Sequence, residues 1–241
     1  MRRYYLIVDV MNLCRFASSF FKLTGNESSQ NERTINVDKK QREELMETAR
    51  RELPYTFSLP DSYESLRALL HDRTIEQQTI IIERMIKCNH SRLAESNKEG
   101  LRSLFIYLLQ YFNDLSSDCT SEESVVFCFR VFRNLVPHVF DLCQFDAKNS
   151  CDAMISVLKE KHDEFDDSCK YPGLDVLLFL ELVGFLFPTS DFRHSVTTPA
   201  IVFIDQMLTK CKVRDRRDVT YGLFLVTLTL KVSIIQFGFL I

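Results

Sequence analysis

The chain has 241 residues, 46% of them hydrophobic and 26% charged, and its formal net charge is −3. This composition excludes disorder throughout, and the slight negative charge excludes a global positive field that would attract nucleic acid. Six glycines and six prolines are too few for a turn-rich all-β fold, and the eight cysteines form no Cys-x-x-Cys pair that would indicate a zinc or redox site.

Residues 1–50 are expected to form an N-terminal segment and a polar linker. The apolar start, Met1–Phe21, is interrupted by polar and charged residues, which disfavours a cleaved signal peptide. The tract Thr24–Lys40 is rich in Asn, Ser, Glu and Lys, a composition typical of a linker. We therefore expect one α-helical repeat domain over residues 51–241.

Helix starts are well marked along the chain. Lys40–Glu52 has helical character, with Glu47 and Arg51 spaced to pair at i,i+4. Later starts are predicted by four pairs with capping-box spacing or its aspartate equivalent, and by one Thr-Pro dipeptide: Asp61–Glu64, Thr74–Gln77, Ser96–Glu99, Thr120–Glu123 and Thr198-Pro199.

Apolar residues recur at the 3.6-residue period within 97–114, 121–143 and 148–166, which predicts three one-sided helices. Pro137 should kink or break the second. His162 continues the third stripe, which favours a partly buried core histidine over a general base.

Pairing neighbouring helices gives about four hairpins: 61–71 with 74–89, 97–114 with 121–143, 148–166 with 173–187, and 198–211 with 215–237. Their length is close to that of HEAT-type units. The prediction is an all-α fold, an irregular HEAT-like α-solenoid, with a compact helical bundle left open.

Signatures of catalysis are absent from the sequence. It has no phosphate-cradling glycine loop, nucleophile elbow, zinc-protease helix or kinase motif set, and its histidines are widely separated. We therefore predict no catalytic, cofactor-binding or metal-binding residues, and a protein that is not an enzyme.

Basic residues gather near the last predicted turn. The candidate RNA-phosphate contacts are Lys210, Lys212, Arg214, Arg216 and Arg217, and a weaker group is Arg84, Lys87 and Arg92. Such residues in helix-hairpin turns can contact phosphates without reading sequence. The local pattern leaves an ordinary solvated turn open.

The stretch Tyr221–Ile241 carries one charge, Lys231, and is nearly long enough to span a bilayer. A buried solenoid helix explains the same composition, because the last helix of a repeat array without its cap is apolar. We expect the buried helix and no membrane, with a membrane anchor as the alternative.

Several segments together resemble one family. They are Glu52–Phe57, Ile82–His90, Leu93–Lys98, Pro172–Val176, Leu186–Phe192, Leu208–Cys211 and Gly222–Phe224. In order and spacing, over roughly residues 50–228, they resemble the nucleolar protein fourteen family of small-subunit ribosome assembly factors.

The resemblance implies a structural protein of the nucleus and nucleolus that acts in the small-subunit processome, in rRNA precursor processing and in small-subunit biogenesis. The implied partners are processome proteins, including a HEAT-repeat nucleolar complex partner, together with the U3 small nucleolar ribonucleoprotein and the small-subunit rRNA precursor. Because family members are much longer, the chain is expected to be a partial member, truncated at its C-terminus.

Two helix junctions are the candidate interaction surface. The first comprises Asn89, His90, Leu93, Asn97 and Lys98; the second comprises Phe187, Pro188, Thr189, Ser190, Asp191 and Phe192. Beside the second, Arg193 stands where the family usually has tryptophan, and loses an aromatic contact. Packing of one hairpin against the next is the alternative role for both junctions, and a helical-repeat adaptor with no RNA role is the alternative function.

Overall fold

The computed structural model describes residues 43–168, 170–188 and 193–237. Within these ranges every regular element is a helix, so the predicted all-α class is confirmed. After a helix over residues 43–52 come α3 (Tyr63–Leu70), α4 (Ile75–Cys88), α5 (Asn97–Ser117), α6 (Glu122–Phe145), α7 (Ala147–Ser168), α8 (Leu174–Leu186), α9 (Thr197–Lys210) and α10 (Arg216–Phe237). The predicted linker 24–40 lies outside the described residues, and the division at residue 50 stays a prediction.

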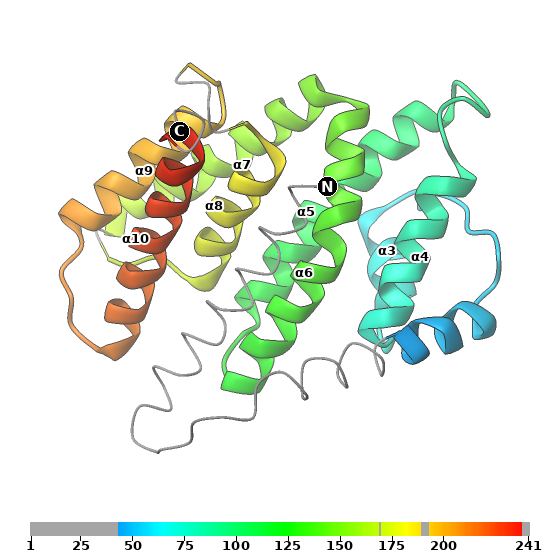
Figure 1. Ribbon diagram of the computed structural model, residues 1–241, viewed down its shortest axis with the longest axis horizontal. Coiled ribbons are helices and arrows are strands. Elements are labelled where there is room, and N and C mark those ends of the chain that lie inside the picture. Colours follow the sequence, from blue (N-terminus) through cyan, green and yellow to red (C-terminus); the bar gives the residue numbers. More distant parts are fainter. Residues whose placement is uncertain (1–42, 169, 189–192, 238–241) are drawn as a thin grey trace.

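The helices follow one another along the longest axis of the molecule in chain order (Figure 1). Alternate helices form two rows. In one row α3 packs against α5 and α5 against α7, and in the other α4 packs against α6, α6 against α8, and α8 against α10. Stacked hairpins produce this order of contacts, so the arrangement is compatible with the predicted α-solenoid.

The turns fall at two edges of this array. Figure 1 shows the connections between hairpins, α4–α5, α6–α7 and α8–α9, along the top of the view, which we call the upper edge. The α5–α6 and α9–α10 turns, which lie inside hairpins, are at the bottom, which we call the lower edge. Successive turns of one kind are therefore neighbours in space although they are distant in sequence.

The core is centred on α8, which packs against α5, α6, α7, α9 and α10. Apolar residues cover all sides of this helix, as expected for a helix that is surrounded by others. Full burial of one leucine side chain contributes about 1.5–3 kcal/mol, so α8 is a main source of stability. Glu181 is buried within this apolar run, with 3% of its surface exposed.

The helices begin close to the predicted positions, but the caps differ in detail. The Thr74–Gln77 capping box is confirmed. Ser62 caps α3 in place of Asp61, and Ser121 with Ser124 forms the box of α6 in place of Thr120 with Glu123. In both cases two adjacent residues are able to cap, and the serine one position later faces the free amides.

Two other predicted caps are wrong. Ser96 makes no side-chain cap bond, because the amides of Asn97 and Lys98 already donate to carbonyls in the preceding turn. Thr198 lies inside α9, and the ring of His194 takes the capping role. Its Nδ1 accepts hydrogen bonds from the amides of Val196 and Thr197 at 3.2 and 3.3 Å.

Of the two effects expected of Pro137, a kink or a break, the break does not occur, since α6 runs through it from Glu122 to Phe145. Buried residues on both sides of the proline, including Leu135, Val136 and Val139, pack in the core and hold the helix together. The prediction of a partly buried His162 is confirmed. Its Nε2 lies 2.6 Å from Gln206 Oε1, and its ring lies 5.1 Å from that of Phe203.

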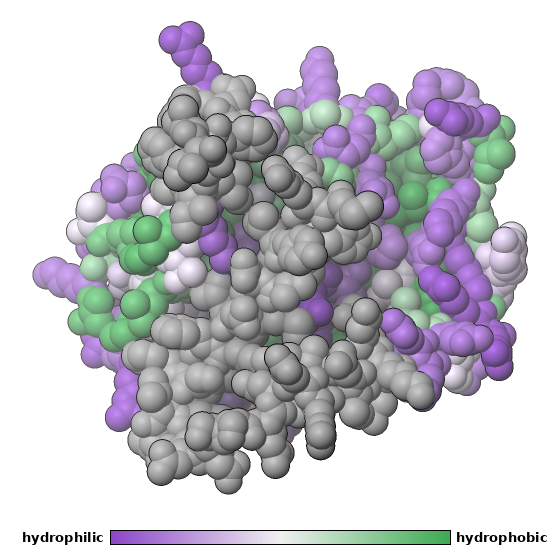
Figure 2. All heavy atoms as spheres, in the orientation of Figure 1, coloured by the Kyte–Doolittle hydropathy of each residue, from purple (hydrophilic) through white to green (hydrophobic). Residues whose placement is uncertain are grey.

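The expectation of a buried last helix holds for one face of α10. Leu225 and Leu228 are buried, whereas Leu223, Val226 and Leu230 are 41%, 40% and 56% exposed. Figure 2 shows hydrophobic surface over the α9–α10 hairpin, at the left of the view. Among the helices of the described ranges, none combines the length and the hydropathy needed to cross a bilayer.

Candidate functional site

The α4–α5 connection at the upper edge contains the first candidate surface. Asn89 and Asn97 build this turn. The Asn89 side chain donates to the carbonyls of Phe57 and Met85 at 2.8 and 2.9 Å, and Asn97 Nδ2 donates to the carbonyl of His90 at 3.4 Å. These two asparagines therefore have structural roles.

The remaining members of this surface face outward. Leu93 is 69% exposed, and His90 is exposed beside it. Lys98 is half-buried and pairs with Glu95. An exposed leucine flanked by polar groups is the composition of a small protein-contact surface.

The segment 53–60, between the helix over residues 43–52 and α3, is tied to α4 by Arg84. The Arg84 guanidinium donates to the carbonyls of Arg50, Leu53 and Pro54 at 2.7, 2.8 and 2.5 Å. It also lies 5.7 Å from the centre of the Tyr55 ring. These backbone contacts give Arg84 a structural role within the fold.

We expect replacement of Asn89 by alanine to lower the free energy of unfolding by about 2 kcal/mol, because the Phe57 carbonyl loses its side-chain donor and the Met85 carbonyl keeps only the backbone amide of residue 89. Segment 53–60 should then be cleaved faster in limited proteolysis. Urea denaturation measures the first effect, and Arg92→Ala, at an exposed position of the same turn, is the matched control. Equal stability of the two variants contradicts this role.

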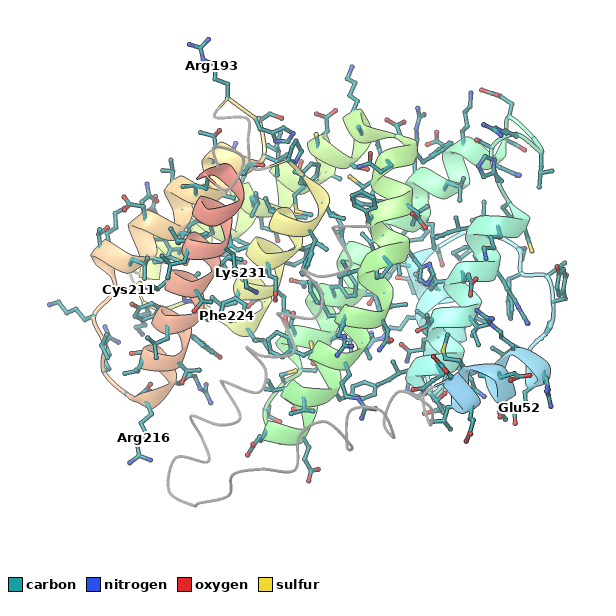
Figure 3. All side chains as sticks on the ribbon, in the orientation of Figure 1. Glu52, Arg193, Cys211, Arg216, Phe224 and Lys231 are labelled. Carbon is teal, nitrogen blue, oxygen red and sulfur yellow. The ribbon has the colours of Figure 1, made fainter. Side chains whose placement is uncertain are left out.

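The second candidate surface lies partly outside the described residues, because Thr189, Ser190, Asp191 and Phe192 do. Phe187 is buried, with its ring 5.4 Å from His194, and Pro188 is exposed. The carbonyl of Pro188 accepts a hydrogen bond from Thr197 Oγ1 at 3.2 Å. The start of the loop is thus anchored to α9. Arg193 points outward from the upper edge (Figure 3).

The five basic residues around the α9–α10 turn divide into two groups. Lys210 Nζ lies 3.1 Å from Asp166 Oδ1 and 6.0 Å from the centre of the Phe165 ring, so it turns back toward α7. Arg216 points away from the body of the protein at the lower edge (Figure 3). Lys212, Arg214 and Arg217 line one open pocket of about 280 Å³.

The opposite wall of this pocket comes from the α7–α8 turn, through Lys170, Tyr171, Pro172 and Gly173. Sequence reasoning missed these residues because they precede the basic group by about forty positions. The predicted stacking of hairpins could have indicated these residues, because stacking brings successive hairpin turns together. Tyr221, on the first turns of α10, completes the aromatic part of the lining.

Two carboxylates also line the pocket, and both are bonded to backbone. Asp215 Oδ1 accepts the amide of Asp218 at 2.9 Å, and Asp218 Oδ2 accepts the amide of Arg214 at 2.9 Å. These bonds shape the start of α10. Burial raises the pKa of the Tyr171 and Tyr221 hydroxyls above their ordinary value, so both rings stay neutral at physiological pH.

Fold and site together define an all-α protein with exposed turns at two opposite edges of a helical array. The upper edge carries the exposed leucine of the α4–α5 turn, and the lower edge carries the basic pocket. A family model described as the Nop14-like family matches residues 17–235 of the chain. The chain belongs to this family. The match extends beyond the segments, roughly 50–228, that carry the resemblance in the sequence.

Curated relatives agree with the family model. The chain is 43% identical to human nucleolar protein 14 over 196 residues, which are 79% of this chain and 22% of the relative. It is 41% identical to the Drosophila melanogaster nucleolar protein 14 homolog over 180 residues, 74% of this chain and 21% of the relative. It is 26% identical to Saccharomyces cerevisiae nucleolar complex protein 14 over 191 residues, 71% of this chain and 21% of the relative.

The chain thus spans about a fifth of the length of these relatives. Their names confirm the predicted nucleolar location. The chain therefore belongs to a family whose curated members are named as nucleolar proteins or nucleolar complex proteins.

Proposed function

We propose that the chain is a non-catalytic scaffold of the small-subunit processome, acting in rRNA precursor processing and in small ribosomal subunit biogenesis. The observation that carries the proposal is the 43% identity to human nucleolar protein 14 over 79% of the chain. The separation of exposed turns to two edges of the array supports a scaffold, because it leaves both edges accessible to partners.

The upper edge is the surface for protein partners, namely processome proteins that include a HEAT-repeat nucleolar complex partner. Its exposed leucine and neighbouring polar groups support this assignment. The lower edge is the surface for the U3 small nucleolar ribonucleoprotein and the small-subunit rRNA precursor. Its basic pocket supports contact with phosphates.

A tagged pull-down from cell extract, with and without ribonuclease, tests the proposal. The expected result is recovery of U3 small nucleolar RNA and of small-subunit rRNA precursor, each lost after ribonuclease. Recovery of protein partners alone, unchanged by ribonuclease, would instead identify a helical-repeat adaptor with no RNA role. Recovery of neither partner class from a folded chain would overturn the scaffold.

Charge reversal at Lys98 tests the upper edge by itself. Lys98→Glu should leave the chain folded and weaken its association with the particle by about fivefold, because an exposed charged contact contributes up to about 1 kcal/mol. Co-sedimentation of the tagged chain with pre-ribosomal particles measures the effect. Lys159→Glu, an equal charge change at an exposed position of α7, is the control. Unchanged association of Lys98→Glu would exclude this turn as a contact.

A further inference from the structure

The lower-edge pocket concentrates positive charge that the chain as a whole lacks. Four cationic side chains line it, Lys170, Lys212, Arg214 and Arg217, against the two carboxylates of Asp215 and Asp218. The lining therefore carries two excess positive charges, while the formal net charge of the chain is −3. Local charge of this kind, rather than a global field, is what attracts an anion to such a protein.

The cations come from three separate elements, which makes the pocket a product of the fold. Lys170 lies in the α7–α8 turn, Lys212 and Arg214 in the α9–α10 turn, and Arg217 in the first turn of α10. The hydrogen bond from the Arg214 amide to Asp218 holds the second turn in place. The pocket forms only when the last two hairpins are stacked.

Arginine and lysine serve different parts of phosphate recognition. The two guanidinium groups offer paired donors that match two phosphate oxygens, and the two lysines supply point charges. The pocket also opens beside the N-terminus of α8, which has no side-chain cap, so its backbone dipoles add positive potential. A phosphate group satisfies this donor set more completely than a carboxylate does, because it offers more oxygens.

Aromatic side chains on the same lining favour a nucleic acid over a phosphorylated peptide. Tyr171 and Tyr221 border the pocket, and both are half-buried and neutral. Gly222 leaves room for the Tyr171 hydroxyl, because a Cβ at that position would lie 3.1 Å from Tyr171 Oη. Tyrosine rings beside a basic groove are a common platform for bases or riboses of single-stranded RNA.

We propose that this pocket binds one backbone phosphate of a single-stranded RNA, with Arg214 and Arg217 as paired donors and Tyr171 and Tyr221 against the adjoining nucleoside. The proposal rests on the proposed function, whose RNA contact it localises. It changes the set of RNA-contacting residues by adding Lys170 and both tyrosines and by removing Lys210 and Arg216. Because phosphate contacts do not read bases, binding is independent of sequence.

Fluorescence anisotropy of a short labelled oligouridine, titrated with the full chain at several KCl concentrations, tests the pocket. Arg214→Ala and Arg217→Ala should each weaken binding about three- to tenfold, the range for one partly exposed charged contact. Each should also lower the slope of log affinity against log salt by about one. Tyr171→Leu should weaken binding with no change in that slope, since it removes stacking and no charge.

Arg216→Ala is the matched control, because it removes the same charge from the first turn of the same helix at a side chain that points away. Its affinity should stay within about twofold of the wild-type value. Equal losses for Arg216→Ala and Arg217→Ala would show a diffuse charge effect and overturn the pocket. Circular dichroism establishes that each variant is folded.

Further arms separate this proposal from its alternatives. If a phosphoserine peptide displaces the RNA at a lower concentration than unlabelled oligouridine does, the site is one for a phosphoprotein, and the RNA proposal is wrong. If the wild-type chain and the double variant Arg214→Ala/Arg217→Ala recover equal amounts of U3 RNA in the pull-down, the pocket is not the RNA-binding site. The proposed scaffold function is then unaffected. Oligouridine binding that is lost in the variants, with no U3 RNA in the pull-down, supports the pocket and overturns the scaffold.

Discussion

Replacing Lys161 by alanine is expected to lower the free energy of unfolding by about 3 kcal/mol. Lys161 Nζ on α7 lies 2.7 Å from Asp175 Oδ2 on α8, and the two side chains are only 10% and 16% exposed. Removal of the lysine leaves a carboxylate inside the α7–α8 hairpin without its counter-charge. An unpaired buried charge costs far more than the loss of a surface ion pair.

Urea denaturation monitored by circular dichroism measures this difference. Lys159→Ala, which removes the same kind of side chain from an exposed position of α7, should change the free energy of unfolding by less than about 0.5 kcal/mol. The double variant Lys161→Met/Asp175→Asn should recover most of the loss, because neither charge is then buried. If Lys161→Ala and Lys159→Ala are equally stable, the pair does not couple the two helices.

Glu181 is expected to make the folded state less stable as the pH rises from about 4.5 to about 7. Burial raises the pKa of Glu181 from 4.5 to about 7, and attraction to Lys231 offsets only part of that increase. In this window the folded chain keeps a proton that the unfolded chain has released, so the free energy of unfolding falls with pH. The shift corresponds to about 3 kcal/mol, fully developed above pH 7.

The variant Glu181→Gln removes this titration. We expect it to be more stable than the wild type by up to about 3 kcal/mol at pH 8, and nearly equal to it at pH 4.5. Urea denaturation at a series of pH values provides the comparison. Burial lowers the pKa of His138, which changes stability in the opposite direction, so the relevant quantity is the difference between the two proteins at each pH. If the difference in free energy of unfolding between the two proteins is the same at every pH, titration of Glu181 does not cause the loss of stability.

Caps and periodicity predicted α3 to α7 and α9, pairing of neighbouring helices added α8 and α10, and all eight lie within a few residues of their predicted bounds. Helix periodicity depends on which residues face the core, and a single stripe carries that information locally. Caps were less reliable because two neighbouring polar residues often both have the required chemistry. Ser62 and Ser121 replaced the predicted Asp61 and Thr120 for this reason. His194 escaped prediction because a histidine ring is an uncommon cap.

The candidate site was predicted only in part, since its composition depends on stacking of the hairpins. The sequence shows Lys212, Arg214 and Arg217 as one basic run, but Lys170 and Tyr171 join them only through the fold. It also could not distinguish cations that face the pocket from Lys210, which contacts Asp166. In the same way, the sequence shows that Arg84 is an arginine, which could bind a phosphate, but it does not show that this side chain donates to backbone carbonyls in the fold.

The separation of the two edges has a consequence for how ligands combine on this protein. The 24 residues of α6 correspond to about 36 Å at 1.5 Å per residue, whereas charges in physiological salt are screened beyond about 8 Å. The charges of a protein held at the upper edge and of an RNA strand held at the lower edge, as proposed above, are therefore screened from each other. Their binding free energies should add, and the chain can bridge the two in one ternary complex.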